Sequence, residues 1–196
     1  KNSILHFFIN HSLAAVSLLA CTKEDLGIEK LVREYQFLKE VFSLEFVFSN
    51  DEREKQKLAD VMDYFSGIGY LNQTGNNGEY TITKQGFDRL PMWGAMVKTF
   101  IESYWIATQA LGMKKDETLS GENLLKHMDY LGKKYLKLGV VEHIGALSRL
   151  NFKNAINLIN KKAAIPSFDS SNEKRPDHER LQELSRRVYD LSRCGR

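Results

Sequence analysis

Five histidines are the first residues to consider for proton transfer or metal binding. His6 and His11 are five residues apart, a spacing that places them on different sides of a helix. We therefore interpret both as core or interfacial histidines bonded to neighbours, and not as metal ligands. His127 and His143 have no acidic or cysteine partner that the sequence can place. The histidines thus predict no catalytic residue and no metal site.

The remaining chemical signatures are equally sparse. Cys21 and Cys194 lie almost the whole chain apart and offer no ligand pair for structural zinc, which indicates a reducing compartment. A glycine-rich phosphate loop, a G-x-S-x-G elbow and an H-E-x-x-H motif are all missing. The common nucleotide-binding, hydrolase and zinc-protease classes are therefore excluded, and we expect no cofactor.

The basic residues suggest a different chemistry, attraction to an anionic surface. The 196 residues include 28 bases and 25 acids, for a net charge of +3. This charge is unevenly spread, since 11 bases and 13 acids occur up to Lys98, whereas 17 bases and 12 acids follow it. The second half, at +5, is therefore the part expected to face an anionic partner.

The N-terminal segment bears on any contact with a membrane. Residues 2–22 contain no Asp, Glu, Lys or Arg, so they fit a membrane span, a signal peptide or a buried helix. The polar residues that make a poor apolar core for a span are His6, Asn10, His11, Ser12 and Ser17. We therefore expect burial or docking at an interface. Leu18–Cys21 resembles a lipoprotein cleavage box, which leaves a lipid-anchored envelope protein as a third class. Because the chain begins at Lys1, we treat it as part of a longer polypeptide.

The elements that must position these residues are almost all helical. Apolar residues with a 3.6-residue period predict helices over about residues 28–43, 51–65, 93–111, 120–138 and 152–159. Pro91 suits the first turn of the long apolar helix that follows it. A linker at 166–176 then precedes a charged terminal helix at 177–196. The predicted fold class is mainly α, with residues 1–165 forming a helical accessory domain, a bundle that contains one winged-helix-like unit.

That unit rests on a predicted β-hairpin at about residues 69–83. The β-prone runs flank Gly75–Gly78, whose residues tolerate positive φ, and helices precede and follow the hairpin. DNA binding would require basic residues here. Residues 51–63, however, hold five acidic residues against three basic ones, and residues 72–79 hold no basic residue. Nucleic acid is therefore not the expected partner. We expect the hairpin to pack on the domain, with these side chains substantially buried: Tyr70, Leu71, Tyr80 and Ile82.

Several patches, taken in order, resemble the C-terminal region of the membrane-associated glycerol-3-phosphate acyltransferases of the large bacterial and mitochondrial type. The patches are Lys1–Phe8 followed by Leu13–Ala15, Phe37–Glu40 followed by Glu45–Phe48, Gly69–Leu71, and Tyr104–Trp105. The resemblance covers about residues 1–165. The order and spacing of the patches carry it, because none of them is a catalytic signature.

The resemblance implies a parent enzyme of phospholipid biosynthesis that transfers an acyl chain from acyl-CoA or acyl-carrier protein to the sn-1 hydroxyl of glycerol 3-phosphate. In that family a histidine in an H-x-x-x-x-D motif deprotonates the hydroxyl, and the Asp orients it. In this chain the residues five positions after each histidine are His11, Val16, Gly132, Ser148 and Glu183. The motif is absent, so no catalytic residue is carried over. The resemblance therefore implies a non-catalytic accessory or regulatory C-terminal domain whose partner is an upstream catalytic domain of the same polypeptide.

A docking role completes the sequence-based hypothesis. The N-terminal helix is expected to dock between this domain and either the catalytic portion or the membrane interface, with lysines attracting anionic headgroups. The expected docking residues are Phe7, Phe8, Leu18, Leu19, Lys114, Lys115, Lys133 and Lys134. The protein is thus expected at a membrane, facing the cytoplasm. The alternative function is a winged-helix regulator or a protein-interaction module.

Overall fold

The computed structural model describes residues 3–21, 27–48, 53–74, 79–113, 121–160 and 177–194. In these ranges the chain is mainly α-helical with one antiparallel hairpin, which confirms the predicted fold class. The elements are α1 (Ser3–Cys21), α2 (Ile28–Val41), α3 (Arg53–Gly67), β1 (Leu71–Thr74), β2 (Glu79–Ile82), α4 (Lys84–Gly112), α5 (Gly121–Lys137), the short 3-10 helix η1 (Ile144–Ala146), α6 (Arg149–Asn160) and α7 (Asp177–Ser192). They form two compact units, residues 1–97 with 193–196 and residues 98–192. The predicted linker at 166–176 lies outside the described residues.

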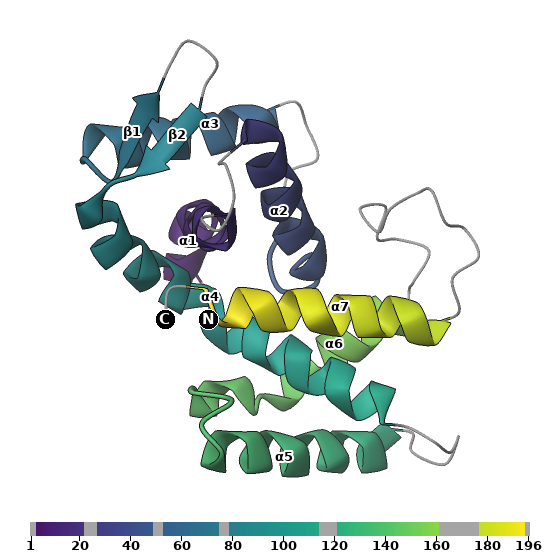
Figure 1. Cartoon of the computed structure of the whole chain (residues 1–196). Coiled ribbons are helices and arrows are strands. Elements are labelled where there is room, and N and C mark those ends of the chain that lie inside the picture. The colour runs from purple at the N-terminus through teal and green to yellow at the C-terminus, as the bar shows by residue number, and fades with distance from the viewer. Residues whose placement is uncertain are drawn as a thin grey trace. The chain divides into compact units, whose positions relative to one another are not determined.

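Helix α1 forms the centre of the first unit. Seen end-on in Figure 1, it is surrounded by α2, α3 and the first part of α4. Leu13, Ala14 and Leu18 are completely buried, and Val16 contacts the backbone of α4 where Gly94 leaves room for it. A helix that buries most of its described side chains is expected to lack charged residues, in agreement with the composition of this segment.

Three polar residues of α1, Asn10, Ser12 and Ser17, find hydrogen-bond partners within the protein. Ser12 and Ser17 each donate to the backbone carbonyl four residues earlier in their own helix. Asn10 accepts a hydrogen bond from the Tyr35 hydroxyl of α2 at 2.9 Å, and burial raises the pKa of that hydroxyl. Among the described residues, no helix combines the length and apolar character that crossing a bilayer demands. Most described side chains of α1 are buried, which agrees with burial, one of the two placements expected from the sequence.

The hairpin joins α3 to α4 with a fixed register. Leu71 pairs with Ile82 and Asn72 with Thr81. Leu71 is buried, whereas Tyr70, Tyr80 and Ile82 are only half-buried. The substantial burial expected from the sequence is therefore nearly complete at Leu71 and partial at the other three side chains.

Helix α4 begins earlier than the sequence predicted. We expected the long apolar helix to start after Pro91, but α4 starts at Lys84 and carries Pro91 in its interior. Thr83 explains the early start, since its hydroxyl accepts a hydrogen bond from the Gly86 amide at 3.0 Å, as an N-cap residue does. Pro91 removes one backbone hydrogen bond to the Phe87 carbonyl, yet the helix continues through it to Gly112.

The second half of α4 is the core of the second unit. All eight residues from Ile101 to Thr108 are buried, and in Figure 1 this part of α4 lies between α5 and α7. Helix α5 ends at Lys137, and Gly139 two residues later has a positive φ of 67°, which favours glycine. Helix α7 buries Leu184, Val188 and Leu191. The charged terminal helix therefore packs on this unit through one apolar face.

Candidate functional site

Helix α5 presents a basic face to solvent. Its apolar side chains, Leu124, Leu125, Met128 and Leu131, point into the second unit. The helical period places the opposite set of side chains on the outside, and all of them are exposed: Lys126, Tyr130, Lys133, Lys134 and Lys137. Lys133 and Lys134, which were predicted as docking residues, therefore share this face with Lys126, Tyr130 and Lys137. These three were not among the predicted site residues.

The two acids of α5 do not neutralise this face. Asp129 pairs with Lys133 at 2.6 Å, and Glu122 pairs with Arg149 of α6. Within the described ranges, Lys126, Lys134 and Lys137 have no carboxylate partner. Exposed ion pairs such as these two contribute little to stability. Lys126, Lys134 and Lys137 are therefore available to an anionic partner.

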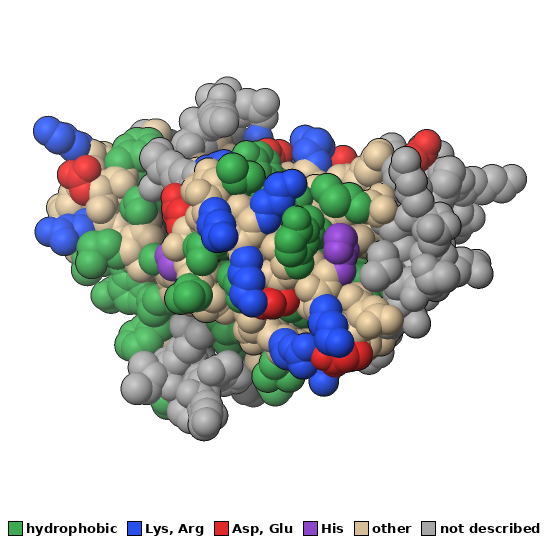
Figure 2. All heavy atoms as spheres, turned by 90° about the horizontal axis from the view of Figure 1, so that it is seen from below, with side chains coloured by type: hydrophobic (Ala, Val, Ile, Leu, Met, Phe, Trp, Pro, Cys, Tyr) green, Lys and Arg blue, Asp and Glu red, His purple; other side chains and the backbone are tan. Residues whose placement is uncertain are grey.

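Apolar side chains are interspersed with these lysines. Figure 2, seen from the α5 side of the second unit, shows Lys and Arg side chains alternating with hydrophobic ones and only a few acids. The exposed apolar residues of this part of the chain are Tyr130, Leu138, Ile144 and Leu150. A surface that combines lysines with aliphatic and aromatic side chains suits contact with a lipid headgroup layer.

The docking residues predicted in α1 divide into two groups. Phe7 is 81% exposed and Phe8 is 40% exposed, whereas Leu18 and Leu19 are buried in the core of the first unit. Phe8 contacts Trp93 of α4 with ring centroids 5.8 Å apart. The exposed Phe7 and Phe8 thus lie at one end of α1, whereas the buried Leu18 and Leu19 hold the helix in its unit. Lys114 and Lys115 lie outside the described residues.

His11 lies beside this aromatic end of α1. Its ring stacks on Trp93 and meets Tyr64 and Phe65 edge-on, and burial lowers its pKa. Its Nδ1 is buried and has no hydrogen-bond partner among the described residues. We expected a histidine bonded to neighbours, but aromatic rings hold this one instead. His11 is therefore a neutral, aromatic-like member of the packing in the first unit.

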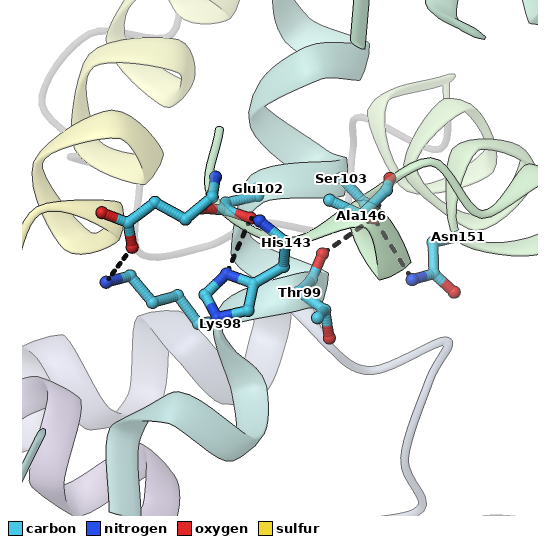
Figure 3. Close-up of polar contacts among 8 residues, drawn as sticks. Lys98, Thr99, Glu102, Ser103, His143, Ala146 and Asn151 are labelled. Atoms are coloured by element: carbon cyan, nitrogen blue, oxygen red, sulfur yellow. Dashed lines mark hydrogen bonds and ion pairs between the residues drawn. The ribbon is translucent and has the colours of Figure 1, made fainter. Parts of the chain in front are cut away.

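The sequence analysis missed a polar centre in the second unit. Figure 3 shows Glu102 of α4 beside His143, and the Glu102 carboxylate accepts hydrogen bonds from the backbone amides of Glu142 and His143 at 2.9 and 3.1 Å. The His143 Nδ1 lies 3.1 Å from the same carboxylate. Lys98 pairs with Glu142 at 2.9 Å. No sequence pattern could reveal this pair, because 40 residues separate its two members and neither has a special local motif.

This centre has the geometry of a structural anchor. Glu102 is almost completely buried, and a buried carboxylate needs hydrogen-bond partners, which two backbone amides and the His143 imidazole supply. The carboxylates of Glu102 and Glu142 and the ring of His143 lie close enough to hold a cation, but Lys98 already compensates Glu142. Next to it, Ser103 lies 2.6 Å from the Ala146 carbonyl and accepts a hydrogen bond from Asn151. Together these contacts attach the segment between α5 and α6 to α4.

The described residues form a mainly helical fold with an exposed lysine-rich face on α5 and exposed aromatic side chains at one end of α1. Residues 1–167 match the family model of the glycerol-3-phosphate acyltransferase C-terminal region. Because the match covers most of the chain, the protein belongs to this family, as the ordered patches of its sequence predicted. No curated protein and no solved structure matched the chain.

Proposed function

We propose that this chain is a non-catalytic accessory region of a glycerol-3-phosphate acyltransferase, and that it holds the enzyme against the anionic, cytoplasmic face of a membrane. The exposed face of α5 is the observation that carries the proposal. Each lysine close to an anionic surface contributes up to about 1 kcal/mol, so the unpaired Lys126, Lys134 and Lys137 contribute a few kcal/mol together. Binding of this strength is peripheral and reversible.

The aromatic end of α1 has a different chemistry and is proposed to have a different partner. Phe7, Phe8, Tyr64 and Met92 are exposed there and carry no charge, which is the composition of the centre of a protein interface. We propose that this surface contacts the catalytic portion of the enzyme. The two surfaces then divide the accessory role, with one binding lipid and the other binding protein.

Vesicle sedimentation tests the lipid part of the proposal. The chain should bind phosphatidylcholine vesicles that contain phosphatidylglycerol, and should not bind vesicles of phosphatidylcholine alone. The double variant Lys134→Gln, Lys137→Gln should bind more weakly by up to about thirtyfold, because each lost lysine removes up to about 1 kcal/mol. Added salt should weaken the binding of the unaltered chain.

A matched pair of substitutions on the first unit provides the control. Lys84→Gln with Arg89→Gln removes the same charge from exposed residues of α4 and should leave vesicle binding unchanged. Equal losses in the two double variants would show a general charge effect and contradict a role for the α5 face. Phe7→Ser should not alter vesicle binding, whereas a loss would assign the α1 surface to lipid. Tighter binding to duplex DNA than to anionic vesicles would instead favour the winged-helix alternative.

A further inference from the structure

Tyr130 lies in the middle of the exposed face of α5, with lysines on both sides. Its side chain is 64% exposed. Lys126 precedes it by four residues, and Lys133 and Lys134 follow it by three and four, which places their Cβ atoms about 5–6 Å from its own. Lys137 lies one turn beyond Lys133. The exposed face of α5 is therefore a patch of four lysines around one tyrosine, which we call the lysine patch.

The hydrogen-bond donors of the lysine patch are open to solvent. Lys126, Lys134 and Lys137 are exposed and form no ion pair within the described ranges. The Tyr130 hydroxyl forms no hydrogen bond with any described residue. Each ammonium group carries three donors and the phenol carries one. The patch can therefore donate several hydrogen bonds to an anion without first breaking bonds of its own.

The basic residues of α5 are all lysines, and the helix contains no arginine. A guanidinium is a rigid planar fork that suits two oxygens of one anion, whereas an ammonium is a compact charge with three rotatable donors. Because lysine side chains are flexible, several ammonium groups can approach one small anion from different directions. The lysine patch therefore favours an anion that concentrates charge and oxygen atoms at one point.

A phosphomonoester has this chemistry. At pH 7 it carries about −1.5 to −2 charges and offers three terminal oxygens that accept strong hydrogen bonds. A phosphodiester, the form of phosphate in most lipid headgroups, has fewer terminal oxygens and a smaller charge, because one more of its oxygens is esterified. Lys126 and Lys134 can each donate to one oxygen of a monoester while Tyr130 donates to the third. The lysine patch therefore fits a monoester better than a diester.

An exposed leucine beside the lysine patch favours a phosphate that belongs to a lipid. Leu138 follows Lys134 by four residues, its amide donates to the Lys134 carbonyl at 3.1 Å, and its side chain is 64% exposed. It therefore extends the row of Lys126, Tyr130 and Lys134 by one turn. A soluble phosphate gains nothing from such a side chain, whereas a headgroup in a membrane brings the apolar layer close to it.

We propose that the lysine patch selects membrane lipids whose headgroup is a phosphomonoester, of the phosphatidate type, over anionic lipids whose headgroup is a phosphodiester. Lys126 and Lys134 bind two oxygens of the phosphate, and the Tyr130 hydroxyl donates to the third. Leu138 contacts the apolar layer beside the headgroup. The inference rests on the docking function proposed above, because it names the headgroup that the same face of α5 prefers.

Vesicles of two compositions test this preference. One contains phosphatidylcholine with phosphatidate and the other phosphatidylcholine with phosphatidylglycerol, in proportions that give both the same electrophoretic mobility and therefore the same surface charge. The chain should bind the phosphatidate vesicles about fivefold more tightly, the effect of one additional hydrogen bond. Equal affinities, or tighter binding to phosphatidylglycerol, would overturn the inference and leave the docking function standing. Binding to neither composition would overturn both.

Tyr130→Phe isolates the hydroxyl, because it removes one donor and keeps every charge. The ratio of the affinities for the two vesicle compositions should fall toward one. Tyr80→Phe is the matched control, since Tyr80 lies half-buried in β2 of the first unit, and it should keep the ratio of the unaltered chain. An unchanged ratio in Tyr130→Phe as well would overturn the proposed contact of the hydroxyl with the third oxygen.

A second variant conserves the charge and tests the requirement for lysine. Lys126→Arg with Lys134→Arg should also lower the affinity ratio, because a guanidinium fork gains less from a third oxygen than an ammonium group does. Lys84→Arg with Lys153→Arg makes the same change at exposed positions of α4 and α6 and should keep the ratio. Equal ratios in the two double variants would overturn the proposed selection by lysine.

Glycerol 3-phosphate distinguishes a lipid headgroup from a soluble phosphomonoester. At millimolar concentration it should release no more of the chain from phosphatidate vesicles than sulfate does at the same ionic strength, because a soluble ion offers neither an apolar layer nor many headgroups on one surface. Release by glycerol 3-phosphate and not by sulfate would assign the lysine patch to a soluble ligand and overturn the lipid assignment.

Discussion

Glu102 shows how one residue secures a whole segment of this protein. A buried carboxylate is costly unless it is paired, and Glu102 obtains its pairing from the backbone amides of residues 142 and 143 and from the His143 ring. Because its partners belong to the segment between α5 and α6, the buried carboxylate attaches this segment to α4. Its role depends on hydrogen bonds to backbone groups, and any side chain at position 142 could provide the same amide.

Replacing Glu102 with Gln should destabilise the second unit by about 2–4 kcal/mol, because the amide keeps the size of the side chain but presents a donor where a buried acceptor is needed. Urea unfolding followed by circular dichroism measures the loss. Glu122→Gln is the control, since it breaks an exposed pair with Arg149 and should cost less than about 1 kcal/mol. Similar losses in the two variants would contradict the anchoring role of Glu102.

Among the elements, the junction of the hairpin with α4 is the most tightly constrained. The Thr83 hydroxyl donates to the Gly69 carbonyl at 2.7 Å and accepts from the Gly86 amide, so one side chain joins the turn before β1 to the start of α4. Gly86 allows this approach, because a Cβ there would overlap the Tyr70 carbonyl oxygen and come within 2.8 Å of Ile82. Backbone contact, more than apolar burial, holds the hairpin on its helix.

Gly86→Ala should therefore destabilise the first unit by about 1–3 kcal/mol, although alanine is the better helix former. The comparison is Gly67→Ala at the end of α3, where a Cβ meets nothing within 4 Å and the stability should stay level or rise by up to about 1 kcal/mol. Thermal unfolding of both variants distinguishes the two positions. A neutral effect of Gly86→Ala would show that the hairpin can move away from α4 without loss.

At the scale of the whole molecule, each compact unit carries its own surface. The first unit exposes uncharged aromatic side chains at one end of α1, and the second exposes the lysines of α5. This division of chemistry suits a region that supports an enzyme through contacts with other molecules.

The isolated chain should show no acyl transfer above background with acyl-CoA and glycerol 3-phosphate, because it lacks the H-x-x-x-x-D motif of the family. Thiol release from acyl-CoA is a suitable measurement. Turnover that disappears in His143→Ala would contradict this expectation and make the Glu102–His143 pair a site. Loss in His178→Ala would instead place a site on α7.

Local patterns in the sequence determined most of this protein by themselves. The apolar period identified the helices, because a helix that packs on one side repeats its buried residues every 3.6 positions, and glycine-rich turn residues identified the hairpin. The family was also recognisable from ordered patches. The early start of α4 was not recognisable from the sequence. Proline usually lies in the first turn of a helix, but the N-cap at Thr83 starts this helix before Pro91.

Only the tertiary structure decided the sites. It brought Glu102 to His143 and separated the exposed Phe7 from the buried Leu18 on one helix. These results depend on contacts between residues far apart in the chain, and side-chain type and spacing carry no information about such distances. The local code specifies which face of a helix is buried, whereas packing of the helices decides which neighbours each face meets.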